Sequence, residues 1–249
     1  MERKIRVAAV DYLNTKPLIY GFEKGLMKNE LEITMDYPSN IAKMLINDEV
    51  DIALVPVSIL PRLKEYHIIS DYCIGCDGEV ASVCLFSDVS IDKIENIILD
   101  YQSSTSVSLC KILIKNHWKI FPEFIKGKPG YEASIKGTTA GLVIGDRALK
   151  QRKPSTYIYD LGYAWKEMMG LPFVFAAWIS NKILPAEFIR SFNTTTGIGI
   201  NNLREIVAAN PFDPYDLYYY YTQNISYQLD NTKREALEIF LELGKKAKV

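Results

Sequence analysis

Buried strands alternate with helices along this chain, and this alternation limits the possible folds more than any other feature. Residues 5–10 are typical of a buried strand, and residues 31–37 and 51–57 predict two more. Between them, Pro17 suits the first turn of a helix, where its missing N–H costs nothing, and residues 41–45 carry apolar side chains at helical spacing. This order of strands and helices predicts a parallel sheet with right-handed crossovers.

The alternation returns in the middle of the chain. Residues 97–100, 140–145 and 173–178 predict three further strands, and Ser103 or Ser104 would cap the helix that follows the first of them. No Gly/Ser-rich or Pro-rich linker separates the two α/β units. We therefore expect a chain of 249 residues that crosses between two lobes more than once and holds a ligand cleft between them.

The charge balance and the start of the chain exclude several classes of protein. The sequence has 29 Lys and Arg against 30 Asp and Glu, whereas nucleic-acid binders and polybasic membrane anchors need clustered positive charge. The first apolar run stops at Asp11, too early for the roughly 7–15 apolar residues of a signal peptide. No window approaches the ~18 apolar residues of a transmembrane helix. We expect a cytoplasmic protein with no nucleic-acid partner and no membrane insertion.

The cysteines and histidines do not predict a metal or redox site. Cys73 and Cys76 have the Cys-x-x-Cys spacing of redox and zinc sites. A zinc site needs two more ligands at a recognisable spacing, which the sequence lacks, and the pair lies in a strand-and-turn context. The two histidines are His67 and His117, for which surface or structural roles are favoured. We expect structural thiols and no metal. The sequence motifs of dinucleotide and nucleotide triphosphate sites are absent as well.

Small hydroxyl and amide side chains gather where the predicted strands end. Ligands of parallel sheets bind beyond the carboxyl ends of strands, where helices begin. Residues 102–106, Gln-Ser-Ser-Thr-Ser, join a strand to a helix N-terminus, where free N–H groups and the helix dipole attract an anion. Two interpretations stay open for this segment: a carboxylate site, or an N-cap with more hydroxyl groups than it needs.

Other strand ends supply further candidates, each with a structural alternative. Asn14 and Thr15 are common turn formers, and Asp146 suits a helix N-cap. The tyrosines at 218–221 are expected to pack, with about half of them facing the core. Near the C-terminus, Thr232 and Glu235 have the spacing of a capping box, with Gly244 as the expected end of the helix. The remaining candidates at strand ends are Ser58 and Ser82.

Residues 10–18, Val-Asp-Tyr-Leu-Asn-Thr-Lys-Pro-Leu, resemble the opening motif of the chorismate dehydratase family of menaquinone biosynthesis, which begins the futalosine route. Each further match is weak alone, but together they are specific because they follow in order from about Arg6 to Trp178. These matches are residues 51–58, 74–83, 103–107, 142–146, 160–162 and 170–175.

The resemblance implies a fold and a reaction. The fold is α/β, a two-lobed type II periplasmic-binding-protein-like fold with an interlobe cleft, in which residues 1–84 plus 177–249 form the first lobe and residues 85–176 the second. The reaction converts chorismate to 3-[(1-carboxyvinyl)oxy]benzoate and water. Because the ring becomes aromatic, no cofactor or metal is needed. The enzyme holds a dianion in a reactive pose and excludes water, and a substrate carboxylate takes the proton.

The resemblance also suggests roles for single residues. Asn14 hydrogen-bonds the substrate near the reacting carbons, and Ser82 orients the enolpyruvyl carboxylate. Many relatives carry Arg at the position of Ser104, which would clamp a carboxylate with two hydrogen bonds. Here either Arg147 supplies the charge or the helix N-terminus suffices. Ser103, Thr105 and Ser106 hold a carboxylate, and the further substrate-binding candidates are Thr15, Ser58, Ser104 and Asp146.

Two alternatives stay open. One is a non-catalytic protein that binds a solute, because this fold usually does so. The other is 1,4-dihydroxy-6-naphthoate synthase of the same pathway, which opens with a Ser-Pro-Cys-Pro-Asn-Asp type of motif and is expected to use a histidine. The opening at residues 12–18, Tyr-Leu-Asn-Thr-Lys-Pro-Leu, favours the dehydratase.

Overall fold

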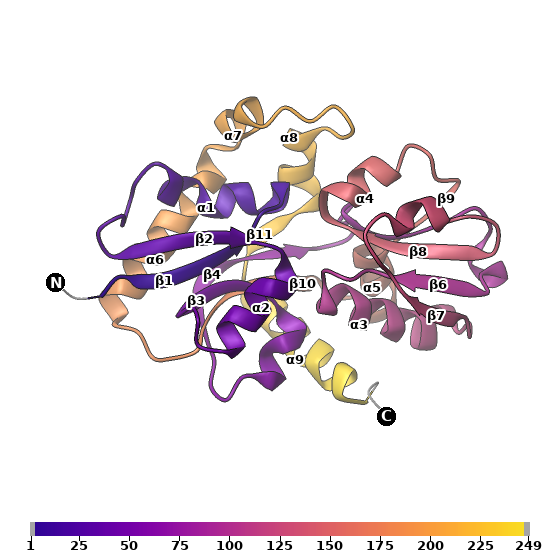
Figure 1. Ribbon diagram of the computed structural model, residues 1–249, viewed down its shortest axis with the longest axis horizontal. Helices are drawn as coiled ribbons and strands as arrows, with labels where there is room; N and C mark the ends of the chain where they lie inside the picture. The colour runs from indigo at the N-terminus through magenta and orange to yellow at the C-terminus, as the bar shows by residue number, and fades with distance from the viewer. Residues whose placement is uncertain (1–2, 247–249) are drawn as a thin grey trace.

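The computed structural model describes residues 3–246, and its strands form two separate sheets (Figure 1). The first sheet has the strand order β11-β4-β10-β3-β1-β2 and the second β7-β6-β8-β5-β9. The first contains β1 (Ile5–Val10), β2 (Leu31–Asp36), β3 (Ile52–Pro56), β4 (His67–Cys76), β10 (Phe173–Ser180) and β11 (Ser226–Gln228). The second contains β5 (Val83–Ser87), β6 (Asn96–Leu99), β7 (Glu123–Lys126), β8 (Thr139–Ile144) and β9 (Tyr157–Asp160).

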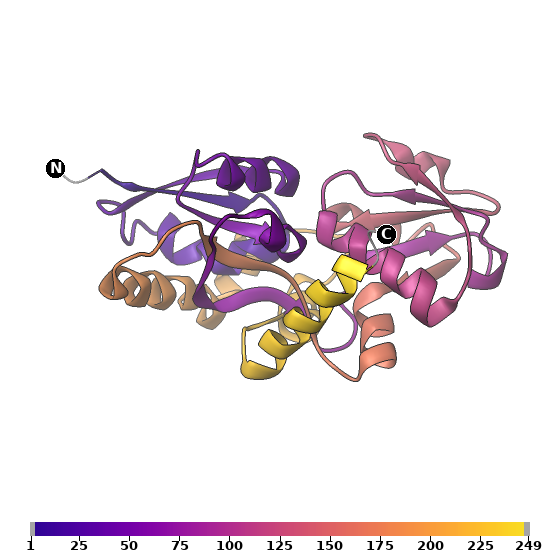
Figure 2. The ribbon, with the colours of Figure 1, turned by 90° about the horizontal axis from the view of Figure 1, so that it is seen from below.

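Helices pack against both sheets, and the last of them, α9, runs beneath the two lobes (Figure 2). None of the helices within residues 3–246 is both long and apolar enough to cross a lipid bilayer. The helices are α1 (Lys16–Glu23), α2 (Pro38–Ile46), α3 (Ser104–Leu113), α4 (Gly145–Gln151), α5 (Leu161–Met169), α6 (Ala186–Gly197), α7 (Leu203–Ala209), α8 (Leu217–Tyr219) and α9 (Asn231–Lys246).

The predicted parallel unit at the start of the chain is confirmed. β1 pairs in parallel with both β2 and β3, and α1 begins with Pro17 in its first turn. Each sheet as a whole is mixed, however. β10 lies antiparallel between β3 and β4, and β5 lies antiparallel between β8 and β9. Apolar patterning predicts that a segment is a strand, but not the direction in which it enters a sheet.

The C-terminal helix is present, but both residues predicted to mark its ends, Thr232 and Gly244, are wrong. The carboxylate of Asp230 accepts a hydrogen bond from the N–H of Lys233 at 2.8 Å, so Asp230 caps α9 in place of Thr232. The helix also continues through Gly244. This glycine has a helical neighbourhood on both sides, and no turn in the described chain requires its conformational freedom.

The chain changes sheet twice, once between β4 and β5 and once between α5 and β10. The strands change sheet within residues 77–82 and 170–172, a few positions before the expected boundaries. The division into residues 1–84 plus 177–249 and residues 85–176 stays a proposal. The N-terminal strands and β11, near the C-terminus, share one sheet. We call the part of the structure around this sheet the first lobe, and the part around the other sheet the second lobe.

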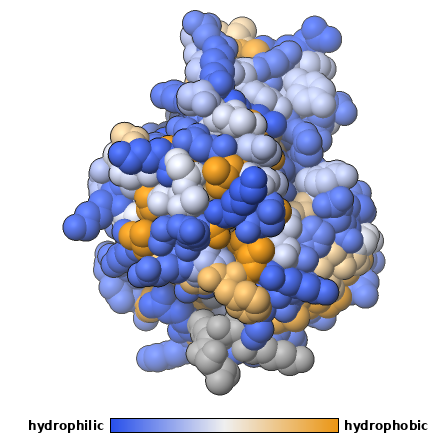
Figure 3. All heavy atoms as spheres, turned by 90° about the vertical axis from the view of Figure 1, so that its right-hand side faces the viewer, coloured by the Kyte–Doolittle hydropathy of each residue, from blue (hydrophilic) through white to orange (hydrophobic). Residues whose placement is uncertain are grey.

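A cluster of packed aromatic side chains joins the two lobes. The ring of Trp165 on α5 packs edge-on against Phe173 of β10 at 5.1 Å and against Phe240 of α9 at 6.2 Å between centroids. Trp165 is fully buried, and its Nε1 donates a hydrogen bond to the carbonyl of Pro172 at 3.0 Å. The outer side of the second lobe is mostly hydrophilic, with apolar side chains in small separate patches (Figure 3).

Asp51, just before β3, is a buried carboxylate that stabilises the first lobe. It accepts hydrogen bonds from the backbone N–H of Arg6 at 2.9 Å and from the Arg6 guanidinium at 2.9 Å, and Lys182 lies 2.5 Å away. Although burial opposes ionisation, these partners hold the pKa of Asp51 well below its usual range. The ionised form is therefore favoured by folding.

We expect Asp51→Asn to lower the free energy of unfolding by about 1–3 kcal/mol at pH 7. A depressed pKa stabilises the fold above the unfolded value of about 3.9 and loses that contribution as the pH falls below it. The difference between variant and parent should therefore shrink below about pH 4. Urea unfolding at pH 7 and pH 3 measures it, with Asp213→Asn, at an exposed carboxylate, as the control. A difference that grows toward pH 3 would contradict this account.

Candidate active site

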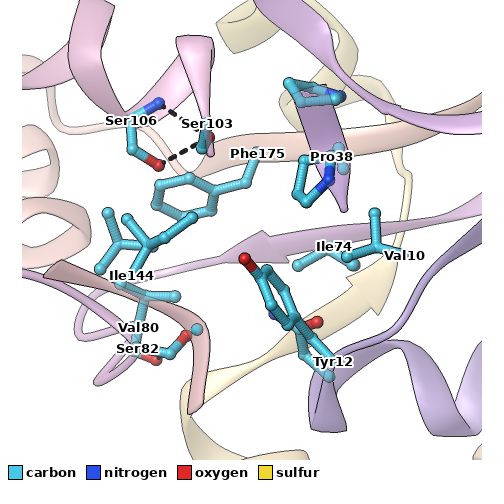
Figure 4. Close-up of a pocket in the computed structure, with 15 residues that line it drawn as sticks. Val10, Tyr12, Pro38, Ile74, Val80, Ser82, Ser103, Ser106, Ile144 and Phe175 are labelled. Carbon is cyan, nitrogen blue, oxygen red and sulfur yellow. Dashed lines mark hydrogen bonds between the residues drawn. The ribbon is translucent and has the colours of Figure 1, made fainter. Parts of the chain in front are cut away.

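The cleft between the lobes holds a cavity of about 490 Å³, counting the part open to solvent (Figure 4). This size lies within the roughly 300–1,000 Å³ of small-molecule sites. Both lobes supply its walls, which are mostly apolar. Among the residues that the structure describes, no Lys, Arg, His, Cys, Asp or Glu lines the cavity. The polar side chains that line it are Tyr12, Asn14, Ser82, Ser103 and Ser106.

Asn14 lies in the 3₁₀ turn Leu13–Thr15 that follows β1, and it is 8% exposed. Its backbone carbonyl accepts a hydrogen bond from the hydroxyl of Tyr227 at 3.0 Å, which fixes the turn. Thr15 is fully buried and lies outside the cavity lining, with its Oγ1 donating to Asn14 Oδ1 at 3.5 Å. The turn therefore presents the Asn14 amide to the cavity and keeps Thr15 behind it.

Ser82 ends the loop that crosses from the first lobe to the second. Its Oγ accepts a hydrogen bond from the hydroxyl of Tyr220 at 2.7 Å, and its N–H donates to the carbonyl of Val80 at 2.7 Å. Ala81 beside it has a φ of 60°, in the left-handed region that a residue with a side chain rarely adopts. Such a conformation persists only where its surroundings hold it.

Asp160 holds this loop in place. Its carboxylate caps α5 by accepting hydrogen bonds from the N–H groups of Gly162 and Tyr163 at 2.9 and 3.1 Å. It also accepts from Val80 N–H at 3.1 Å and Ala81 N–H at 2.7 Å. Burial raises the pKa of Asp160, although these N–H groups act in the opposite direction. One carboxylate thus fixes both a helix start and the strained loop before Ser82.

The N-terminus of α3 faces the same cavity from the second lobe. Ser103 is the N-cap, as predicted, because its Oγ accepts a hydrogen bond from the N–H of Ser106 at 3.3 Å. The two hydroxyl groups lie 3.0 Å apart (Figure 4). The N–H groups of Ser104 and Thr105 belong to the first turn and have no acceptor within the helix. This end of α3 therefore suits a carboxylate.

Three predicted residues tie the lobes together outside the cavity lining. Thr105 is fully buried, and its Oγ1 accepts a hydrogen bond from the N–H of Ser58 at 3.0 Å. The hydroxyl groups of Ser58 and Ser104 lie 2.7 Å apart. Since residues 57–62 belong to the first lobe and α3 to the second, these bonds join the two lobes beside the cleft.

Asp146 joins the lobes on another side. Its carboxylate accepts a hydrogen bond from the N–H of Leu13 at 3.1 Å, next to Asn14. The N-cap of α4 is Ile144, so the expectation that Asp146 caps this helix is wrong. Burial raises the pKa of Asp146, and the hydrogen bond from Leu13 partly opposes that shift. Asp146 therefore positions the turn that carries Asn14.

Arg147 does not supply charge to the cavity. Its guanidinium lies 2.6 Å from Asp100 Oδ2 and 2.6 Å from Glu132 Oε1, and it donates to Gln102 Oε1 at 2.6 Å. Tyr12 donates a hydrogen bond to the same oxygen of Gln102. Because two carboxylates neutralise Arg147, the α3 N-terminus is left as the positive element at the cavity.

Two tyrosines at the site were missed by sequence reasoning: Tyr12, which lines the cavity, and Tyr220, which lies outside the lining and bonds Ser82. The hydroxyl of Tyr220 is fully buried and bonds Ser82, a residue 138 positions away. Burial raises the pKa of Tyr220 well above its usual value, although hydrogen bonds to Ser82 and Asn14 act in the opposite direction. Of the run 218–221, Tyr220 and Tyr221 are buried, so the expected half does face inward. Tyr220 begins a π-helical turn, Tyr220–Asn224, and such turns are frequent at functional sites. This feature is visible in the structure and not in the sequence.

The cysteines and histidines take no part in the cavity. Cys73 and Cys76 are free, buried thiols whose pKa values are raised by burial, as expected for structural thiols. His67 lies 2.7 Å from Glu65, and His117 lies 3.5 Å from Glu167. Within residues 3–246 no group of three or more His, Cys, Asp or Glu side chains has the geometry of a metal site.

Sequence comparisons place the chain among proteins of one biosynthetic route. A family model described as menaquinone biosynthesis matches residues 5–246. The chorismate dehydratase of Thermus thermophilus is 26% identical over 229 residues, which cover 82% of this chain and 83% of the relative. The chorismate dehydratase of Campylobacter jejuni is 29% identical over 245 residues, covering 95% and 96%.

Structural comparisons confirm the predicted fold. A crystal structure of a protein from Archaeoglobus fulgidus has a TM-score of 0.78 at 16% identity and covers 98% of each chain. The alkanesulfonate-binding protein of Xanthomonas axonopodis pv. citri has a TM-score of 0.64 at 12% identity, covering 99% of this chain and 94% of the other. A Candida albicans protein with the periplasmic binding protein fold has a TM-score of 0.63 at 12% identity, covering 98% and 91%. At identities of 12–16%, this similarity shows that the chain has the two-lobed binding-protein fold. It does not identify the ligand of the chain.

Proposed function

Because the chain belongs to the menaquinone biosynthesis family, we propose that it is a chorismate dehydratase, which removes water from chorismate and releases 3-[(1-carboxyvinyl)oxy]benzoate. The observation that carries the proposal is the match, over 82% and 95% of the chain, to two relatives with that name. The proposal includes the hydro-lyase class of reaction and the expected cytoplasmic location. Conversion of chorismate to a product lighter by one water, in buffer without metal or cofactor, tests it.

The reaction asks for little chemistry from the protein. The ring carbon next to the enol-ether oxygen loses a proton, and the electron pair of that C–H bond forms a new C=C bond. The C–O bond to the neighbouring hydroxyl breaks, and the hydroxyl leaves as water with a proton. The ring gains its third double bond and becomes aromatic, which drives the elimination. Catalysis then depends on holding the dianion in one pose in a water-excluded site.

The cavity offers polar groups on opposite sides for such a dianion. In the proposal, the Asn14 amide hydrogen-bonds the substrate near the reacting carbons, and Ser82 orients the enolpyruvyl carboxylate. Ser103 and Ser106, with the N–H groups of the α3 N-terminus, hold a carboxylate. Five further predicted residues position these groups in the proposal: Thr15, Ser58, Ser104, Thr105 and Asp146.

A carboxylate of the substrate serves as the base in this proposal. The described residues that line the cavity include no histidine, lysine or carboxylate, so the wall offers no conventional general base. The side chains around the polar groups are apolar, among them Val10, Ile74, Val80, Ile144 and Phe175. Such walls weaken the hydration of a substrate carboxylate and strengthen it as a proton acceptor. Neither histidine lines the cavity, which argues against the histidine-dependent sister enzyme.

We expect kcat to be nearly independent of pH between about 6 and 9. Among the described residues, the titratable group in the cavity wall is Tyr12, and Tyr220 supports the wall from behind through its bond to Ser82. Burial raises the pKa of both tyrosines, so both hydroxyl groups stay protonated over this range. Initial rates at saturating chorismate across this range provide the measurement. A fall in kcat with a midpoint near 6.5 would indicate a histidine and contradict the proposal.

Tyr220→Phe should lower kcat about tenfold, with little change in thermal stability. The substitution removes the hydroxyl that bonds Ser82 at 2.7 Å and leaves the buried ring in place. A tenfold fall corresponds to about 1.4 kcal/mol, which is within the range for loss of one well-aligned hydrogen bond. Steady-state kinetics give the result, and Tyr218→Phe, at an exposed ring of the same run, is the matched control. Equal kcat values for the two variants would show that Tyr220 only packs.

A further inference from the structure

A second groove opens beside the cavity on the interlobe cleft. It has a volume of about 1,230 Å³, counting the part open to solvent. Its walls are α2 and residues 57–62 of the first lobe, and α3 with β7 of the second. Four exposed cations line it: Lys43, Arg62, Lys111 and Lys126. We call this surface the basic groove.

The basic groove borders the cavity. Pro38 at the start of α2 and Ser103 at the start of α3 line both spaces. Figure 4 shows both side chains in the upper half of the view, Ser103 on the left and Pro38 on the right. A molecule that lies in the groove is therefore next to the part of the cavity wall that Pro38 and Ser103 form, at the starts of two helices.

The positive charge of the groove is not neutralised by nearby carboxylates. Within residues 3–246, none of the four cations forms an ion pair, and Lys111 lies over the ring of Phe124 at 5.3 Å. The one carboxylate that lines the groove is Asp100, and Arg147 pairs with it at 2.6 Å. The chain as a whole has a net charge of −1, so this concentration of positive charge is local.

We propose that the basic groove is an anion-binding surface that captures a small dicarboxylate before it enters the cavity between Pro38 and Ser103. The inference rests on the proposed function, whose substrate carries two carboxylates. The cavity wall has no charged side chain, so its donors act only on a molecule already inside. Charges in a groove act over a Debye length of about 8–10 Å and raise the local concentration of an oppositely charged ligand. Because the four cations are exposed, each contact is weak and the captured anion is released readily.

The test compares two variants that remove four positive charges each. The groove variant is K43Q/R62Q/K111Q/K126Q, and the matched control is K28Q/K93Q/K136Q/K153Q, at exposed lysines outside the groove. At low ionic strength, kcat/KM for chorismate should fall about tenfold in the groove variant and less than twofold in the control. The kcat values should stay equal, and the difference should disappear at about 0.5 M salt, where charges are screened. Equal kcat/KM values at low salt, or a loss that persists at high salt, would overturn the proposal.

A binding experiment separates this inference from the proposed function. Thermal unfolding of each variant is followed while isophthalate, a stable aromatic dicarboxylate, is added at low and at high salt. Stabilisation that depends on salt in the control and is lost in the groove variant supports the groove, even if the parent chain does not convert chorismate. The same stabilisation in both variants overturns the groove, even if the parent chain is an active dehydratase.

Discussion

Replacing Asn14 with alanine is expected to lower kcat for chorismate dehydration by at least about 100-fold, because a positioned hydrogen-bond donor in a dry site contributes about that much. The fold should be unaffected. The bond that fixes the turn goes to the Asn14 backbone carbonyl from Tyr227, and the alanine variant keeps it. The contact between Thr15 Oγ1 and the Asn14 side chain is long, at 3.5 Å. The Tyr220 hydroxyl, which also interacts with Asn14, keeps its bond to Ser82 in the variant. Rates at saturating chorismate, together with thermal unfolding, measure both expectations.

Two further variants sharpen this experiment. Asn14→Asp keeps the shape of the side chain but places a negative charge beside a dianion, so its kcat should be at least as low as that of the alanine variant. Asn40→Ala, at an exposed amide on α2 that bonds Asp36, should behave like the parent. An Asn14→Ala protein that keeps a third or more of the parent kcat would remove Asn14 from the catalytic account.

Replacing Asp160 with alanine is expected to lower the free energy of unfolding by about 3–7 kcal/mol, the largest stability effect that the structure predicts. The substitution leaves four backbone N–H groups without their acceptor. Those of Val80 and Ala81 are buried in the loop, and those of Gly162, which is also buried, and Tyr163 belong to the cap of α5. Each of the two unsatisfied loop donors costs about 1–3 kcal/mol, and the lost cap of α5 adds about 1 kcal/mol. Urea unfolding of the variant and the parent measures the difference.

The control for Asp160 is another helix cap at an exposed position. Asp230→Ala removes the cap of α9 but leaves no donor in the loop before Ser82, so it should cost about 1 kcal/mol. Asp160→Asn keeps one acceptor oxygen and should fall between these two variants. It should also lower kcat, because the loop that ends at Ser82 loses part of its support. Equal losses for Asp160→Ala and Asp230→Ala would show that the loop does not depend on the buried carboxylate.

The first lobe was predictable where local signals act alone. Residues 5–10 carry their own strand pattern, and Pro17 marks a helix start, so the parallel unit follows from neighbours in sequence. β10 shows the limit of such reasoning. Its eight residues are all buried and its pattern predicts a strand, but its antiparallel place between β3 and β4 depends on how the chain returns from the second lobe. The C-terminal helix shows a different limit. Both Asp230 and Thr232 are suitable N-cap residues, but the helix begins at Asn231, so Asp230 is the cap and Thr232 already lies in the first turn.

The candidate site divides in a similar way. The ends of the predicted strands indicated which segments lie at the site. Of the residues predicted there, four line the cavity: Asn14, Ser82, Ser103 and Ser106. The same argument selected Ser58 and Asp146, whose groups instead bond residues of the opposite lobe. A hydroxyl or carboxylate at a strand end can point either way, and tertiary contacts decide which. The Tyr220 hydroxyl had no signal in the sequence, because its partner lies 138 residues away.

The central claim is that this chain dehydrates chorismate, and the most direct measurement is to incubate the purified protein with chorismate and identify the products by chromatography and mass spectrometry. The account predicts a product lighter by one water that keeps the carboxyvinyl group on an aromatic ring, formed catalytically and in the absence of metal or cofactor. The Asn14→Ala protein under the same conditions sets the background. Chorismate recovered unchanged, or an aromatic product that has lost the carboxyvinyl group, would contradict the account.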